Sequence, residues 1–147
     1  MLITILLAGC AGPAPVGTWS GSCDIVDPWM GSPDILELAF TVVDDDTRDG
    51  DATVWSISEA TARYTDTAEG SGHYSRKGGS VEIYLAMSAL DYCPKDTPEC
   101  SERFSIYVDG VRDRGDLEGT CEVSIGGSYG YAPAPGGAAP IALIWAR

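Results

Sequence analysis

Few residues in this 147-residue sequence are of the types that carry out chemistry: one histidine, five cysteines and a run of aspartates. His73 has no nucleophile at a motif spacing, and the sequence holds no phosphate-binding glycine loop with its Lys and Ser. A lone histidine on a strand is usually structural or solvated. The sequence therefore predicts a protein that is not an enzyme and that needs no cofactor.

The aspartate run is the one place where a metal ion could bind. Asp44-Asp45-Asp46-Thr47-Arg48-Asp49-Gly50-Asp51 combines clustered carboxylates with a turn glycine, as Ca²⁺ sites do. The run departs from the EF-hand pattern, because counting from Asp45 puts Thr47 at the third position and no Glu at the twelfth. An Asp-Gly hairpin turn on an acidic surface accounts for the same residues. We expect no metal, with calcium as the alternative.

The chain begins with an apolar run that ends in a cysteine, Met-Leu-Ile-Thr-Ile-Leu-Leu-Ala-Gly-Cys. This run is too short to span a bilayer, which takes about 20 apolar residues. Leu7-Ala8-Gly9-Cys10 resembles the lipobox of bacterial lipoproteins, although no Lys or Arg precedes the run. The resemblance implies a signal peptide at 1–9 that is removed, a lipid on Cys10, and a short linker at 10–15.

The same resemblance implies a location. A lipid on Cys10 would anchor the protein in the bacterial cell envelope, and Ala11, which is not Asp, favours the outer membrane. The alternative is a buried first strand that ends in an ordinary cysteine.

If Cys10 carries the lipid, four cysteines remain. An exported protein folds outside the reducing cytoplasm, which favours disulfides among these four. Cys93 and Cys100 flank a short loop with two prolines, which leaves Cys23 to pair with Cys121. A crossed pairing stays open, because the pairing must bring Cα atoms within about 7 Å. Zinc is disfavoured, because there is no Cys-x-x-Cys and the only histidine is distant in sequence from every cysteine.

From Val16 onward, apolar and polar residues alternate and turn residues recur about every ten to twelve positions, which is typical of an antiparallel meander. Closing such a meander leaves no unpaired edge. The sequence predicts an all-β fold over 16–147, an eight-stranded antiparallel up-and-down β-barrel. The predicted strands are 16–25, 34–43, 51–58, 70–76, 80–88, 102–109, 115–125 and 139–147.

The inward faces of these strands are bulky, which favours a barrel filled with side chains, although a pocket near its mouth stays open. The predicted inward residues are Trp19, Cys23, Ile25, Leu36, Leu38, Phe40, Val42, Val81, Ile83, Leu85, Met87, Phe104, Ile106, Val108, Leu117, Cys121, Val123, Ile125, Ile141, Leu143 and Trp145.

The two ends of the barrel sequence resemble the calycin superfamily, which includes the lipocalins and avidins. Gly17-Thr18-Trp19 opens the first strand and Arg147 follows Trp145 in phase on the last. The resemblance implies that Trp19 packs across the barrel base against Arg147, a cation–π contact worth about 0.5 to 2 kcal/mol. Gly70–Ser75 and Leu117–Cys121 are similar to segments of small bacterial lipocalin-like lipoproteins.

Alternate loops of an up-and-down barrel lie at opposite ends. The loops 27–33, 59–69, 89–101 and 126–138 are long, whereas 44–50, 77–79 and 110–114 are short and share their end with both termini. A lipid on Cys10 would therefore lie at the short-loop end. The long-loop end is the expected rim for a ligand or partner, and it carries Trp29, Met30, Tyr64, Tyr92, Tyr129 and Tyr131.

The net charge of −13 excludes a nucleic-acid partner, because phosphate binding needs clustered Lys and Arg. Three functions fit the sequence: a lipid-anchored module that contacts a protein partner, a carrier of a small apolar ligand, and an inhibitor of lysozyme type. The last rests on Ala62-Arg63-Tyr64 and Lys77-Gly78, which resemble motifs of the lysozyme-inhibitor lipoproteins. Negative charge would favour the encounter with a basic lysozyme.

Overall fold

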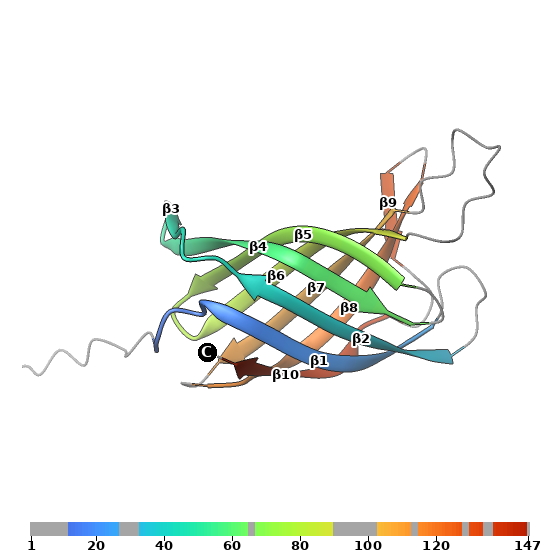
Figure 1. Cartoon of the computed structure of the whole chain (residues 1–147), viewed down its shortest axis with the longest axis horizontal. Helices are drawn as coiled ribbons and strands as arrows, with labels where there is room; N and C mark the ends of the chain where they lie inside the picture. Colours follow the sequence, from blue (N-terminus) through green and yellow to red (C-terminus); the bar gives the residue numbers. More distant parts are fainter. Residues whose placement is uncertain are drawn as a thin grey trace, which may run out of the picture.

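The computed structural model describes residues 12–26, 33–64, 67–89, 103–112, 115–127, 130–133 and 137–146. These residues form an all-β structure in which eight long antiparallel strands close into a barrel (Figure 1). The predicted fold class is thus confirmed. The strands are β1 (Gly17–Val26), β2 (Pro33–Val42), β3 (Thr47–Asp49), β4 (Ala52–Arg63), β5 (Thr67–Lys77), β6 (Ser80–Ala89), β7 (Arg103–Arg112), β8 (Leu117–Gly127), β9 (Gly130–Pro133) and β10 (Ala139–Ala146).

The described part of the chain holds no helix of the length and apolar character that crossing a membrane requires.

The last strand closes the barrel by pairing with two partners along different parts of its length. Residues 142–146 of β10 pair with 18–22 of β1, whereas 139–143 pair with 117–121 of β8. The two ladders overlap only at Ala142 and Leu143. We call this short double ladder the seam of the barrel.

A disulfide between Cys23 and Cys121 lies beside the seam, with a Cα–Cα distance of 6.7 Å. Cys23 is the first β1 residue beyond the ladder to β10, and Cys121 pairs with Ala139 at the start of β10. The bond therefore joins β1 to β8 where the hydrogen bonds between β1 and β10 stop. This confirms one predicted pairing, whereas Cys10, Cys93 and Cys100 lie outside the described residues.

Alternation along each strand fills the barrel interior with side chains. Cross-strand pairs such as Trp19 with Phe40 and Leu85 with Ile106 place large groups on the same inner face. Every predicted inward residue with a described side chain belongs to the core, Ile25 and Trp145 being only partly buried, and the side chain of Ile125 is not described. The core also contains six residues outside the predicted set: Trp55, Ile57, Ala60, Ala62, Ala68 and Tyr74.

The predicted loop at 59–69 is wrong, because β4 continues to Arg63 and β5 begins at Thr67. The register between β4 and β5 shifts between Ile57 and Ala60, and Glu59 has a positive φ of 53°. Such a bulge inserts one residue and reverses the phase of inward and outward positions. Ala60 and Ala62 are buried beyond it, so the strand continues where the two-residue alternation breaks.

Two short strands lie within segments that the sequence predicted as loops. β3 pairs with β4 inside the predicted 44–50 turn, and β9 pairs with the end of β8 inside the predicted 126–138 loop. β7 also reaches Arg112 and so includes the first three residues of the predicted 110–114 turn. Figure 1 shows β3 and β9 near opposite ends of the barrel.

The predicted distribution of the connections over the two ends is confirmed. One end carries residues 12–16, the β2–β4 connection with β3, the turn at Gly78 and Gly79, and the end of β10, and we call it the base (Figure 1). At the far end β1, β4, β6 and β8 end and β2, β5 and β7 begin.

Glycine permits a close approach of two strands at Gly72 of β5. A Cβ atom at this position would collide with the backbone carbonyl of Tyr84 on β6. The neighbouring strand would have to move, because the obstacle is main chain and not the end of a side chain.

We therefore expect Gly72→Ala to lower the free energy of unfolding by about 1 to 3 kcal/mol, as overpacking does in other cores. Urea unfolding measures the change. Gly79→Ala is the matched control, because its Cβ meets no atom within 4 Å and should shift stability by less than about 0.5 kcal/mol. Equal effects of the two substitutions would contradict the conclusion that the close approach of β5 and β6 requires glycine at position 72.

Candidate functional site

The base of the barrel is closed by a continuous set of aromatic rings. The ring centroids of Trp55 and Tyr74 lie 5.8 Å apart, those of Tyr74 and Trp19 5.9 Å, and those of Trp19 and Trp145 5.8 Å. Trp19, Trp55 and Tyr74 are fully buried, and Trp145 is partly buried against them. We call these four residues the base aromatics.

Two arginines cover the base aromatics. The guanidinium carbon of Arg112 lies 4.3 Å from the ring centroid of Trp145 and 5.1 Å from that of Trp19. Arg76 lies 5.0 Å from the ring centroid of Trp55. Arg112 is only 8% exposed, so its cation–π contacts are largely shielded from water. Such contacts are stronger in a desolvated environment than at an exposed site.

These cationic and aromatic side chains hold the segment that enters the barrel, residues 12–16. Arg112 donates to the Pro13 carbonyl at 2.7 Å, and Arg76 donates to the same carbonyl at 3.1 Å. The indole N–H groups of Trp19 and Trp145 donate to the carbonyls of Pro15 and Val16 at 2.8 and 3.0 Å. Four side chains from four strands thus fix the path of the segment before β1.

Arg112 also fixes the next turn, because its Nε donates to the Gly115 carbonyl at 2.9 Å. Burial raises the pKa of the nearby Tyr74 phenol above its ordinary value, against the opposing effect of the Arg112 and Arg76 charges. Tyr74 therefore remains a neutral ring at physiological pH. The base is a cationic and aromatic clamp for main-chain carbonyls.

Among the described residues, the arginine that lies over Trp19 is Arg112 of β7, whereas the resemblance implied Arg147. Arg147 lies outside the described residues, and the observed contact is made by Arg112. The two-residue alternation of β7 could have predicted that Arg112 faces the barrel interior, because residue 112 continues the inward series of Phe104, Ile106 and Val108. The predicted turn at 110–114 ends the strand before this position, so Arg112 is not among the predicted inward residues.

Of the predicted rim residues, the structure describes the side chain of Tyr64 alone. Tyr64 follows β4 and packs edge-on against Phe104, with ring centroids 5.9 Å apart. It is half-buried against the core and forms part of its far end. Trp29, Met30, Tyr92 and Tyr129 lie outside the described residues, and of Tyr131 only the backbone, in β9, is described.

Two carboxylates of the aspartate run at the base bind neighbouring groups of the protein. The amide of Ser56 donates to Asp45 Oδ1 at 2.8 Å, and hydrogen bonds from the side chain and backbone of Ser56 lower the pKa of Asp45 below its ordinary value. Asp51 forms an ion pair with Lys77 at 2.9 Å. Within the described residues, no three His, Cys, Asp or Glu side chains converge as metal ligands.

A Gly-x-Ser-x-Gly pattern, which sequence reasoning missed, occurs at Gly126-Gly127-Ser128-Tyr129-Gly130. In hydrolases this pattern joins a strand to a helix and exposes the serine. Here it joins the antiparallel strands β8 and β9, whose register pairs Gly127 with Gly130. The backbone context therefore differs from that of a nucleophile elbow, and Ser128 itself lies outside the described residues.

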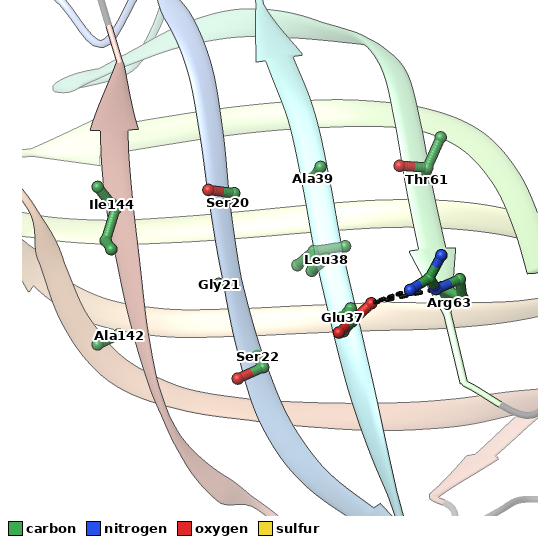
Figure 2. A pocket seen from close by; sticks show the side chains of 10 residues that line it. All are labelled: Ser20, Gly21, Ser22, Glu37, Leu38, Ala39, Thr61, Arg63, Ala142 and Ile144. Atoms are coloured by element: carbon green, nitrogen blue, oxygen red, sulfur yellow. Dashed lines mark hydrogen bonds and ion pairs between the residues drawn. The ribbon is translucent and has the colours of Figure 1, made fainter.

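The outer surface carries a depression of about 650 Å³ over β10, β1, β2 and β4 (Figure 2). Its floor is formed by small groups, including Ser20, Gly21 and Ala39, and the ion pair between Arg63 and Glu37, at 3.1 Å, borders it (Figure 2). The depression is open and its lining mixes apolar and polar groups, so nothing in it selects one ligand chemistry.

No protein-family model, curated protein or solved structure matches this chain. The fold is therefore assigned from the structure itself, and it is a closed eight-stranded antiparallel β-barrel compatible with a calycin-like fold.

Proposed function

We propose that this protein is a lipid-anchored, non-catalytic module of the bacterial cell envelope, held by its base on the outer membrane and contacting a protein partner with its exposed surface. The observation that carries the proposal is the clamp on residues 12–16. The Pro13 carbonyl accepts hydrogen bonds from both Arg76 and Arg112. Pro13 is three residues after Cys10, so the Cα atoms of the two residues lie within about 11 Å of each other. A lipid on Cys10 would thus keep the base close to the membrane surface.

The filled barrel supports a contact module over a carrier. Trp19, Phe40, Tyr74, Leu85 and Met87 are among the large side chains in the interior, each at most 1% exposed. A carrier of lipocalin type encloses its ligand in a cavity within the barrel. Recognition of a partner by the outer surface or by the far end is compatible with a solid interior.

The structure gives no support to the inhibitor alternative. Arg63 ends β4 at the far end and pairs with Glu37, whereas Lys77 ends β5 at the base and pairs with Asp51. Ala62 is fully buried. The residues that resemble the inhibitor motifs are thus divided between opposite ends of the barrel and share no surface.

Lipid labelling tests the anchor directly. We expect the full chain, expressed in a Gram-negative host with an alkyne fatty acid, to incorporate the label and to sediment with membranes. Cys10→Ser should abolish both results, because the thiol is the site of attachment. A Cys23→Ser, Cys121→Ser double variant is the control for loss of cysteines in general and should keep the label. Label on Cys10→Ser, or none on the natural chain, would contradict the proposal.

A further inference from the structure

The outer face of β5, β6 and β7 carries a row of three rings that the base and the seam do not use. His73 pairs with Tyr84, and Tyr84 pairs with Tyr107, in direct cross-strand register. Their ring centroids are 5.4 and 5.1 Å apart. We call these residues the aromatic row. It lines a depression of about 450 Å³ on the barrel surface.

Two carboxylates line the same depression. Glu82 and Asp109 are direct cross-strand partners on β6 and β7, two residues along each strand from Tyr84 and Tyr107, so they share the outer face with them. Like charges directly opposite each other on neighbouring strands are destabilising. Among the described residues no cation lies within ion-pair distance of either group. Glu82 and Asp109 thus form a pair of carboxylates without a cationic partner in the described part of the chain, and they lie beside the rings of the aromatic row.

The aromatic row is exposed yet partly fixed. Tyr107 is 42% exposed, so part of its ring is open to solvent and to a ligand. The hydroxyl of Ser105, a fully buried residue, donates to the Tyr84 hydroxyl at 3.3 Å. This contact orients the central ring, so a ligand would meet a largely preformed surface.

We propose that this cluster binds an arginine side chain presented by a basic protein partner. A guanidinium group stacks on ring faces and also forms paired hydrogen bonds with carboxylates, and the depression offers both. The chain itself stacks Arg112 on two indoles at the base. The net charge of −13 also matches a basic partner. This inference rests on the proposed function and names the class of its partner.

The test is an NMR titration of the full chain with acetyl-arginine amide, with acetyl-citrulline amide as the neutral isostere. Arginine amide should shift the amide signals of residues 73, 84, 107 and 109 saturably, and citrulline amide should bind at least about fivefold more weakly because it lacks the charge. Equal binding of both compounds would overturn the proposal. Saturable binding of a neutral monosaccharide at these signals, with no preference for arginine, would overturn it in favour of a sugar platform.

Charge-matched variants separate the site from general attraction to an acidic protein. Glu82→Gln with Asp109→Asn should weaken arginine amide binding by at least about fivefold. Glu69→Gln with Glu118→Gln removes the same charge elsewhere on the outer surface and should leave binding unchanged. Tyr107→Ala should weaken binding, whereas Tyr107→Phe should retain it. Equal losses in the two charge variants would overturn the site.

These readouts do not depend on the anchor. A chain that binds arginine amide as expected but takes no label on Cys10 would refute the proposed membrane attachment and leave this site intact. A labelled chain that shows no preference for arginine would refute this site alone.

Discussion

Removing the Cys23–Cys121 disulfide is expected to lower the free energy of unfolding by about 4 to 5 kcal/mol, a large part of the roughly 5 to 15 kcal/mol that native domains possess. The bond links residues 98 apart in sequence, so most of the chain gains freedom in the unfolded state when it is removed. In the chain-entropy model, the stabilisation by a disulfide grows with the logarithm of the loop that it closes.

The position of the bond adds a local consequence. The ladder between β1 and β10 ends at Ser22, and the disulfide begins at Cys23. Without the bond, the last part of β1 keeps only its pairing with β2. We therefore expect the amides of Asp24 and Ile25 to exchange with solvent faster, whereas those of β6, at the other side of the barrel, should change less.

The double variant Cys23→Ala, Cys121→Ala isolates this bond from any other disulfide. Urea unfolding gives the global change, and amide hydrogen exchange gives the local one. The natural chain treated with a reductant should show at least as large a loss of stability. A change of less than about 1 kcal/mol, or exchange that increases equally over the whole barrel, would contradict the role of the bond at the seam.

Arg112→Gln is expected to destabilise the protein by about 2 to 4 kcal/mol and to release residues 12–16 from the base. The substitution removes a buried charge that contacts two indoles and donates to the carbonyls of Pro13 and Gly115. A buried acceptor that loses a charged donor incurs a desolvation cost; that cost falls mainly on the Gly115 carbonyl, because Arg76 still donates to the carbonyl of Pro13. Glutamine is too short to reach both carbonyls and the rings together.

Two measurements separate the parts of this prediction. Urea unfolding reports the loss of stability, and limited proteolysis under native conditions reports release of the N-terminal segment. Arg103→Gln is the matched control, because Arg103 is exposed at the far end of β7. We expect Arg103→Gln to remain within about 0.5 kcal/mol of the natural chain. An intact N-terminus in Arg112→Gln would show that the clamp does not depend on this residue.

Strand periodicity predicts the architecture because it reports local burial. Alternation identified the inward residues of β1, β2, β6, β7, β8 and β10, and the count of eight strands then determined which loops share an end. The pairing of Cys23 with Cys121 is the one that the even number of remaining cysteines and the short loop between Cys93 and Cys100 favour, and a crossed pairing stays open until the structure shows the bond. These features depend on the chain's own spacing and not on contacts between distant segments.

Other features depend on register, which spacing alone does not determine. The bulge at Glu59 reverses the alternation, so the spacing of Ala60 and Ala62 predicts a loop where β4 continues. Arg112 lies over Trp19 only because the ends of β1 and β7 meet at the base. In the same way, Tyr84 and Tyr107 become neighbours through the β6–β7 register, although 23 positions separate them in the sequence.

The clamp on residues 12–16 and the proposed lipid on Cys10 together predict the orientation of the barrel. If the lipid is on Cys10 and residues 12–16 are fixed to the base, the barrel stands on the membrane with its far end outward. Strands of the length of β4, 12 residues, separate the two ends by about 30 Å when tilted as in barrels of this size. That separation is large enough to measure by energy transfer to a dye on lipid headgroups.

The most direct test places a fluorescent amino acid at Gly79, in the base turn, or at Arg103, at the far end, of the lipidated protein in vesicles that contain a headgroup acceptor. The account predicts efficient energy transfer from position 79 and much weaker transfer from position 103. Equal transfer from the two positions, or stronger transfer from position 103, would show that the barrel does not stand on its base.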